Sequence, residues 1–228
     1  FEVLAMKTIR GKKDETTDVF DTLDDRFLTV PSFAVEKCRE LANEMATKAK
    51  DSFFEAISLL NSYDKELERK IVESESLIDR YEDKIGSYLI KIAGKETSEK
   101  ESQEVSQLLH VIGDIERISD HSVNVMEAAA EINSKKINFS DEANNELMVF
   151  TGAVKEILAI TTDSFVSRDA EKAKQVEPLE QVIDNLRAKI KKNHIKRLQH
   201  GNCTMELGFV LSDLLNNYSR IADHCSNV

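Results

Sequence analysis

The chain repeats one short stretch near the end of each half: residues 116–124 read ERISDHSVN and residues 219–227 read SRIADHCSN. Arg, Ile, Asp, His and Asn keep the same spacing in both copies. Within each copy the Asp and the Asn stand four residues apart, so an α-helix would place them on one face with Cβ atoms roughly 5–6 Å apart. The repeat therefore predicts two related helical units.

A second match precedes the first in each half. Glu75 and Asp79 bound the sequence ESLID, and Glu180 and Asp184 bound the sequence EQVID. Both matches keep their order along the chain, which indicates an internal duplication of a long segment.

Apolar residues recur at helical intervals through most of the chain, and polar turn-forming residues interrupt them. Pro31 suits the first position of a helix, and Ser98 with Glu101 fits a capping box. The sequence therefore predicts an all-α fold of two tandem three-helix bundles. We expect the first bundle at residues 31–133 and the second at 134–228.

Composition agrees with long helices and restricts the function. The 228 residues include only 7 Gly and 2 Pro, which leaves few turns. A net charge of -11 argues against a nucleic-acid-binding protein, which needs a basic patch. The 3 Cys show no C-x-x-C spacing, which favours reduced thiols inside a cell. No apolar run approaches the ~18 residues needed to cross a membrane.

Residues 1–30 predict a tether rather than a bundle helix. A short apolar patch is followed by the basic Lys7, Arg10, Lys12 and Lys13, as after a membrane span on its cytoplasmic side. A disordered chain end would explain the same composition. Because the chain does not open on Met, we expect it to be a fragment of a longer protein.

The acidic pairs of the first unit predict a cation site. Glu75 and Asp79 on the second helix, and Glu116 and Asp120 on the third, each stand four residues apart beside the buried face. If the two pairs converge, their oxygens suit iron, manganese, magnesium or zinc. Further candidate ligands are His121 and Asn124 in this unit and His224 and Asn227 in the other.

The second unit predicts a weaker site. Glu180, Asp184 and Asp223 match the acids of the first unit, but Ser219 stands where Glu116 stands. One carboxylate is lost, so we expect weaker metal binding there or none.

Basic neighbours could neutralise the same carboxylates without a metal. Arg80, Lys84 and Arg117 lie on the same helices and could form ordinary surface ion pairs with them. A like-charge pair four residues apart costs a few tenths of a kcal/mol in an isolated helix, so some cation should compensate it. The sequence leaves open whether that cation is a metal ion or a side chain.

Recognisable catalytic motifs are missing from the sequence. The chain lacks the Glu-x-x-His of di-iron bundles and the His-Glu-x-x-His of zinc proteases. A metal-dependent phosphoryl hydrolase would need open coordination positions and an activated water, for which no residue argues. We therefore predict that the protein is not an enzyme.

These features together resemble the PhoU family. The resemblance rests on the Glu-x-x-x-Asp motif from Glu116 to Asp120, its altered copy from Ser219 to Asp223, and the Glu-x-x-Ile-Asp stretch on each preceding helix. The sequence LDDRFLTVP at residues 23–31 is similar to the start of PhoU-like domains fused behind membrane domains of the Na/phosphate cotransporter family.

The resemblance implies a regulator of phosphate transport at the cytoplasmic face of the cell membrane. Its expected partner is an attached or neighbouring transmembrane phosphate transporter domain, and the bundle could also form a homodimer. An alternative hypothesis is a structural or dimerisation bundle without metal. The metal-facing residues implied for iron, zinc or manganese are Glu75, Asp79, Glu116 and Asp120 in the first unit, and Glu180, Asp184 and Asp223 in the second.

Overall fold

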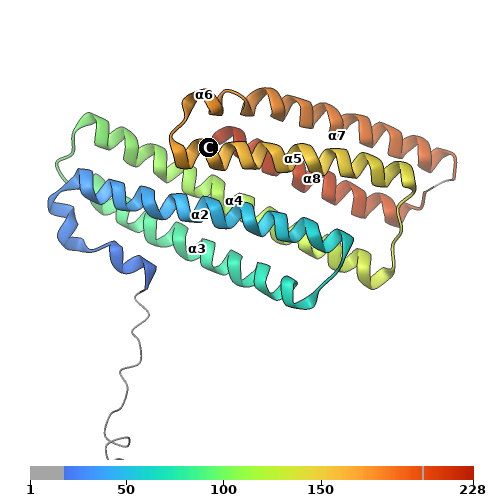
Figure 1. The fold of residues 1–228 in the computed structure, drawn as a ribbon, viewed down its shortest axis with the longest axis horizontal. Coiled ribbons are helices and arrows are strands. Elements are labelled where there is room, and N and C mark those ends of the chain that lie inside the picture. Colours follow the sequence, from blue (N-terminus) through green and yellow to red (C-terminus); the bar gives the residue numbers. More distant parts are fainter. Residues whose placement is uncertain (1–17, 202) are drawn as a thin grey trace, which may run out of the picture.

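Three long helices form the first unit of the fold. The computed structural model describes residues 18–201 and 203–228. Helices α2, α3 and α4 pack against one another in all three pairs, and Figure 1 shows them lying along one another. Their bounds are Pro31–Asn61, Lys65–Ala93 and Glu99–Lys135.

The second unit repeats this arrangement with α5, α7 and α8, which also contact one another in all three pairs. The described residues contain no strand. The predicted all-α fold is therefore confirmed. The bounds of the helices are Asp141–Ser167 for α5, Val176–Gln199 for α7 and Met205–Asn227 for α8, with the short α6 (Ala170–Ala173) between α5 and α7.

Local sequence signals set the helix ends. Pro31 is the first residue of α2. Ser98 Oγ accepts from the backbone N–H of Glu101, and Glu101 Oε2 accepts from the backbone N–H of Ser98, which is the predicted capping box. Helix α4 continues past the predicted boundary at residue 133 and ends at Lys135; the next residue, Lys136, adopts the left-handed conformation with φ 52°.

Helix α6 is not predicted by apolar spacing because it buries no side chain. Its start is set by Asp169, whose carboxylate accepts from the backbone N–H of Glu171 at 3.1 Å and of Lys172 at 3.0 Å. Such capping stabilises the first turn of a helix without any contribution from the core.

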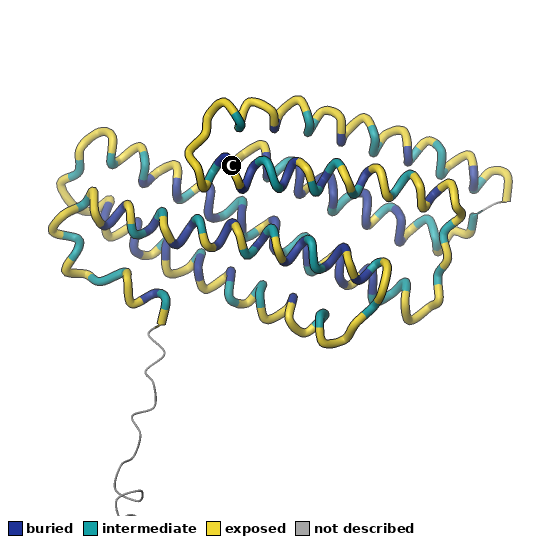
Figure 2. Tube along the Cα trace, viewed as in Figure 1, coloured by how far each residue is buried: buried dark blue, intermediate teal, exposed yellow. Residues whose placement is uncertain are grey.

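The two units share one hydrophobic core. Helix α4 packs against α8 and α2 packs against α5, and Figure 2 shows buried stretches along the long helices of both units. Tyr218 of α8 contacts Phe53 of α2 and Phe150 of α5, with ring centroids 5.6 Å apart in each pair. Separating the units would therefore expose apolar side chains to water.

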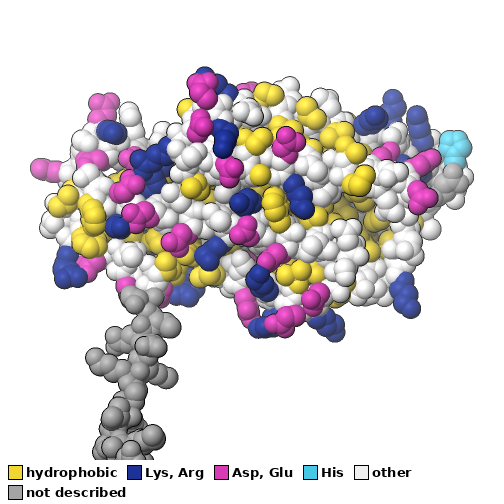
Figure 3. Space-filling model, in the orientation of Figure 1, with side chains coloured by type: hydrophobic (Ala, Val, Ile, Leu, Met, Phe, Trp, Pro, Cys, Tyr) yellow, Lys and Arg dark blue, Asp and Glu magenta, His cyan; other side chains and the backbone are white. Residues whose placement is uncertain are grey.

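Acidic and basic side chains are interspersed on the face of the molecule shown in Figure 3. Arg168, at the end of α5, reaches Glu36 of α2 with Nη2 and Oε2 2.7 Å apart. Both side chains are about half exposed, and exposed pairs of this kind contribute only ~0–1 kcal/mol. Apolar packing rather than surface charge therefore holds the units together.

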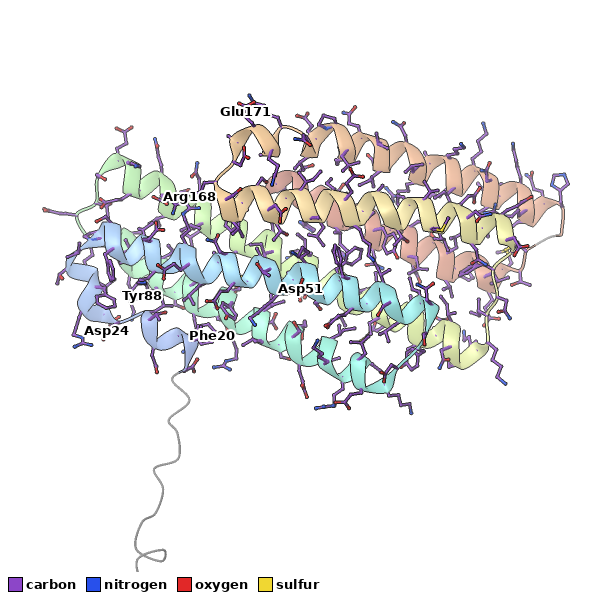
Figure 4. The ribbon with its side chains drawn as sticks, viewed as in Figure 1. Phe20, Asp24, Asp51, Tyr88, Arg168 and Glu171 are labelled. Atoms are coloured by element: carbon purple, nitrogen blue, oxygen red, sulfur yellow. The ribbon has the colours of Figure 1, made fainter. Side chains whose placement is uncertain are left out.

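The described residues ahead of α2 are folded onto the first unit as two short 3-10 helices, η1 (Val19–Thr22) and η2 (Asp25–Thr29). Phe20 packs edge-on against Tyr81 with ring centroids 4.9 Å apart. The Tyr88 hydroxyl donates to the carbonyl of Asp24 at 2.6 Å (Figure 4). The predicted tether is thus anchored from residue 18 onward, and its earlier part with the basic residues lies outside the described residues.

Candidate metal centre

Three carboxylates from α3 and α4 meet on the surface of the first unit. Each of Glu75, Asp79 and Asp120 offers an oxygen, and these oxygens lie within 4.8 Å of one another. Glu75 and Asp79 are one turn apart on α3, and Asp120 belongs to the repeated motif in α4. We call these three residues the first acidic cluster. The predicted convergence of acids from two helices is therefore present.

Glu116 lies beside the first acidic cluster on a half-buried part of α4. Burial, followed by the negative charge of Asp120, raises the pKa of Glu116 to about 7. Burial and neighbouring carboxylates also raise the pKa of Glu75 and of Asp79. Repulsion between neighbouring carboxylates contributes to these raised pKa values, and a nearby cation would favour the charged forms.

Arg80, one of the basic side chains that could have neutralised the first acidic cluster, is directed elsewhere. Arg80 Nη2 lies 3.2 Å from Asp18 Oδ2, and the guanidinium stacks 5.2 Å from the ring centroid of Phe20. Arg117 lowers the pKa of Glu116 by its charge. Within residues 18–201 and 203–228, no ion pair within 4.0 Å joins a Lys or Arg to the cluster or to Glu116.

The second unit contains an equivalent group of acids. Oxygens of Glu180, Asp184 and Asp223 lie within 4.8 Å of one another, and we call these residues the second acidic cluster. Burial, followed by the charges of Asp184 and Asp223, raises the pKa of Glu180. Arg220 Nη1 lies 3.3 Å from Asp223 Oδ2.

Ser219, which replaces Glu116, connects the second acidic cluster to an arginine. Its hydroxyl donates to Asp184 Oδ1 at 3.2 Å. Arg187 donates through Nη1 to Ser219 Oγ at 3.3 Å and through Nη2 to Asn216 Oδ1 at 2.9 Å. The second cluster is therefore bordered by a cation from its own unit.

Arg187 and Lys191 are functional candidates that the acidic motifs do not predict. Lys191 Nζ donates to the same oxygen of Asn216 at 3.2 Å. The signal that identifies both residues is the match between the two Glu-x-x-Ile-Asp stretches. Continued along the helices, this match aligns Arg187 with Glu82 and Lys191 with Gly86.

The histidine and asparagine of each motif face the other unit. His121 Nδ1 and Asn217 Oδ1 are 2.9 Å apart, and Asn124 Nδ2 donates to the same oxygen at 3.2 Å. Both contacts run from α4 to α8. These predicted additional ligands therefore bond to α8 and are not among the three residues of the first acidic cluster.

The second copy makes the same contacts in reverse with Asp114, which occupies the position equivalent to Asn217. His224 Nδ1 and Asp114 Oδ1 are 2.8 Å apart, and Asn227 Nδ2 donates to that oxygen at 3.0 Å. The rings of His121 and His224 stack with centroids 5.6 Å apart. We call this contact the α4–α8 seam; its residues are Asp114, His121, Asn124, Asn217, His224 and Asn227.

The first acidic cluster can hold a divalent cation. Carboxylate oxygens suit magnesium, manganese, iron and zinc. Three oxygens at the 4.8 Å limit would lie about 2.8 Å from a central ion, so a small side-chain movement would bring all three to the roughly 2.0–2.6 Å of a metal–oxygen bond. The ion would supply positive charge and join α3 to α4 through Glu75, Asp79 and Asp120. The residues present therefore fit a metal ion, and Glu116 makes the fit more complete in the first unit than in the second.

Comparison with known proteins identifies the family. The PhoU domain matches residues 42–129 and 150–228, which together cover more than half of the chain. The chain belongs to the PhoU family. Each matched segment contains one copy of the motif and one acidic cluster, so both PhoU repeats include their predicted acids.

Two PhoU relatives cover most of the chain. A "Phosphate-specific transport system accessory protein PhoU homolog 1" from Thermotoga maritima is 27% identical over 187 residues, which is 82% of this chain and 80% of the relative. A "Phosphate-specific transport system accessory protein PhoU homolog" from Borreliella burgdorferi is 26% identical over 181 residues, covering 76% of this chain and 80% of the relative.

Solved PhoU structures have the same fold. The PhoU of Pseudomonas aeruginosa superposes with a TM-score of 0.78 at 18% identity, covering 84% of this chain and 91% of that one. The regulatory protein PhoU of Streptococcus pneumoniae gives a TM-score of 0.75 at 17% identity, covering 86% and 92%. Among the described helices of the present chain, none is both long enough and apolar enough to span a bilayer.

Proposed function

We propose that this chain is a non-enzymatic regulatory domain of phosphate transport, acting on the cytoplasmic side of the membrane on an attached or neighbouring transporter. Membership of the PhoU family supports this function, as do relatives named accessory proteins of phosphate-specific transport systems. The likeness of residues 23–31 to the entry of domains fused behind Na/phosphate cotransporters supports a transporter within the same polypeptide.

We further infer that the domain responds to a divalent transition metal at the first acidic cluster, with iron, zinc and manganese as candidates. One observation carries this inference: carboxylates from two helices converge within 4.8 Å, with Glu116 beside them and no ion-paired base among the described residues. Metal binding would neutralise the exposed face formed by α3 and α4. A partner that contacts this face would then meet a different charge in each state.

Elemental analysis of the purified chain tests the metal site. Asp120→Asn keeps the shape of the side chain but removes its charge, so we expect loss of bound metal. The matched control is Glu73→Gln, an exposed carboxylate on α3 that pairs with Arg69 at 2.5 Å and lies outside the cluster. Equal metal content in the two variants would contradict the assignment. A wild-type chain that remains metal-free after dialysis against Mn²⁺, Zn²⁺ or anaerobic Fe²⁺ would favour the structural bundle.

Phosphate uptake tests the regulatory part. In cells that carry the domain with its transporter, we expect Asp120→Asn to change the rate of labelled phosphate uptake, with Glu73→Gln unchanged. A purely structural bundle predicts the same uptake for both variants.

A further inference from the structure

Equivalent positions on the two acidic faces carry opposite charges. One turn after Asp79, α3 carries Glu82, and one turn after Asp184, α7 carries Arg187. Burial, followed by the charges of Asp83 and Asp79, raises the pKa of Glu82. The α3 face therefore adds a further acid at the position where the α7 face supplies a base.

The helices packed against these faces, α4 and α8, also differ at equivalent positions, and α8 carries fewer acids. Helix α4 presents Gly113 and Glu116, and α8 presents Asn216 and Ser219 at the equivalent positions. Both residues of α8 accept hydrogen bonds from Arg187. In the second unit, an acid and a residue without a side chain have thus been replaced by two acceptors for one arginine.

Arg187 is fixed in position rather than extended into solvent. Its Nη1 and Nη2 donate to two different residues of α8, and its Nε is buried. A guanidinium stays charged at every relevant pH and holds its donors in a rigid plane. Because Ser219 Oγ accepts from Arg187 and donates to Asp184, a single hydroxyl links the arginine to the second acidic cluster.

A second cation gathers at the same place. Lys191 Nζ shares Asn216 Oδ1 with Arg187, and both side chains are half-buried. Among the described residues, neither forms an ion pair within 4.0 Å. Two like charges on one neutral oxygen are costly unless negative charge lies nearby. Burial, followed by the charge of Arg187, lowers the pKa of Lys191. Asp184 is joined to Arg187 through the hydroxyl of Ser219.

We propose that Arg187, with Lys191 beside it, is the resident counter-cation of the second acidic cluster and does there what a metal ion does at the first. The part concerning metal rests on the proposed function, whereas the part concerning charge rests on geometry alone. Because Arg187 is part of the chain, its positive charge cannot leave the second acidic cluster. The charge of the face formed by α7 and α8 therefore stays constant. Only the first face then changes when metal binds or leaves.

The charge part is tested without metal. In protein treated with EDTA, Arg187→Met removes the guanidinium but keeps an apolar stem of similar length, which leaves Glu180 and Asp184 without it while Arg220 still pairs with Asp223. We expect the melting temperature at pH 8 to fall by about 2–4 °C, as expected for a modest loss in a chain of this size. The control is Arg69→Met, an exposed arginine whose partners Glu66 and Glu73 lie outside both clusters. Equal melting of the two variants would overturn the proposal, whatever the metal result.

The metal part is tested in a chain whose first cluster is silenced by Asp120→Asn. Equilibrium dialysis against Mn²⁺ or Zn²⁺ should show no bound metal in this background. Adding Arg187→Glu and Ser219→Glu, the residues of the first unit at those positions, should restore one bound ion per chain. Metal bound at the second cluster with Arg187 intact would overturn the proposal.

The reciprocal variant Glu82→Arg should weaken metal binding at the first cluster by at least tenfold. If no variant binds metal but Arg187→Met melts lower than its control, the proposed metal response fails and the counter-cation remains.

Discussion

Each copy of the repeated motif contacts the other unit on one side of its helix and its own unit on the other side. The pattern of contacts is the same in both copies on the first side, whereas the charges differ on the second. In the α4–α8 seam, His121 and Asn124 meet Asn217 just as His224 and Asn227 meet Asp114. On the outer faces, the two copies have diverged in charge: Glu116 corresponds to Ser219 and Glu82 to Arg187.

The difference between the seam and the outer faces follows from the contacts that residues make in each place. In the seam, the His and Asn of each motif bond to one residue on the other unit's helix, Asn217 or Asp114, and the two His rings stack on each other. A change there therefore alters a contact that joins both units. A residue on the outer face contacts only its own unit and solvent, so each copy can change independently. The duplication therefore yields one shared joint and two separately adjustable surfaces.

The largest expected effect comes from breaking the seam on one side only. Asp114→Ala removes the partner of both His224 and Asn227, and it should lower the free energy of unfolding by about 2 kcal/mol because the partly buried His224 and the exposed Asn227 lose their bonds across the seam. The melting temperature should fall by about 4–8 °C.

Asp114→Asn is the matched control for this seam variant, because it gives both sides of the seam the same residue. We expect this variant to lose less than about 1 kcal/mol. Equal losses for Asp114→Ala and Asp114→Asn in thermal unfolding would show that charge, rather than a shared acceptor, holds the seam.

A smaller effect is expected in the pH dependence of the free energy of unfolding, to which Glu116 contributes and Ser219 does not. The pKa of Glu116 is raised to about 7 by burial and by Asp120, so the native state binds its proton more tightly than the unfolded chain does. In metal-free protein, this carboxyl should reduce stability as pH rises from about 4.5 to 7. Glu116→Gln should flatten that dependence, with a gain on the order of 1 kcal/mol at pH 8 after allowance for solvent screening.

The matched control is Glu73→Gln, which removes an exposed carboxylate of α3 that lies outside both clusters. Denaturant titrations at pH 5 and pH 8 measure both variants. A steeper dependence in Glu116→Gln would contradict the assigned repulsion.

The smallest perturbation to the wild-type chain is chemical labelling of its thiols, which reports seam opening without a substitution. Burial raises the pKa of Cys225 and of Cys38 to about 12, so both thiols stay protonated and protected at pH 8. We expect Cys203, which is half-buried, to react first with a disulfide reagent.

Labelling of the Asp114→Ala variant then localises the opening. Cys225 follows His224 in the motif and should react roughly tenfold faster there, because a loss of 1–2 kcal/mol changes an opening equilibrium by about that factor. Cys38, buried in the first unit, should keep its rate. Peptide mass spectrometry separates the two, and equal acceleration of both would indicate global unfolding rather than seam opening.

Much of the fold follows from the sequence because helix length, capping and apolar spacing act locally. The capping box at Ser98 and the helix start at Pro31 are examples. The short helix α6 does not follow, because it contributes nothing to the core and depends on one capping carboxylate at Asp169.

The site could be predicted in part. Spacing places Glu75 and Asp79 on one face and Asp120 on another helix, and the repeat argues that these faces are neighbours. Spacing does not say which neighbour a flanking residue meets. His121 follows Asp120 directly but points across the seam, and Arg80 follows Asp79 directly but binds Asp18. Such assignments depend on the angle between packed helices, which no single helix encodes.

The incoming chain is attached to α3 beside the first acidic cluster. Asp18 and Phe20 are held by Arg80 and Tyr81, the residues that immediately follow Asp79. The contacts that hold residues 18–20 and the carboxylate of Asp79 thus lie on consecutive residues of one turn of α3. A substitution at Phe20 or Tyr81 would therefore act on the turn that also carries Asp79.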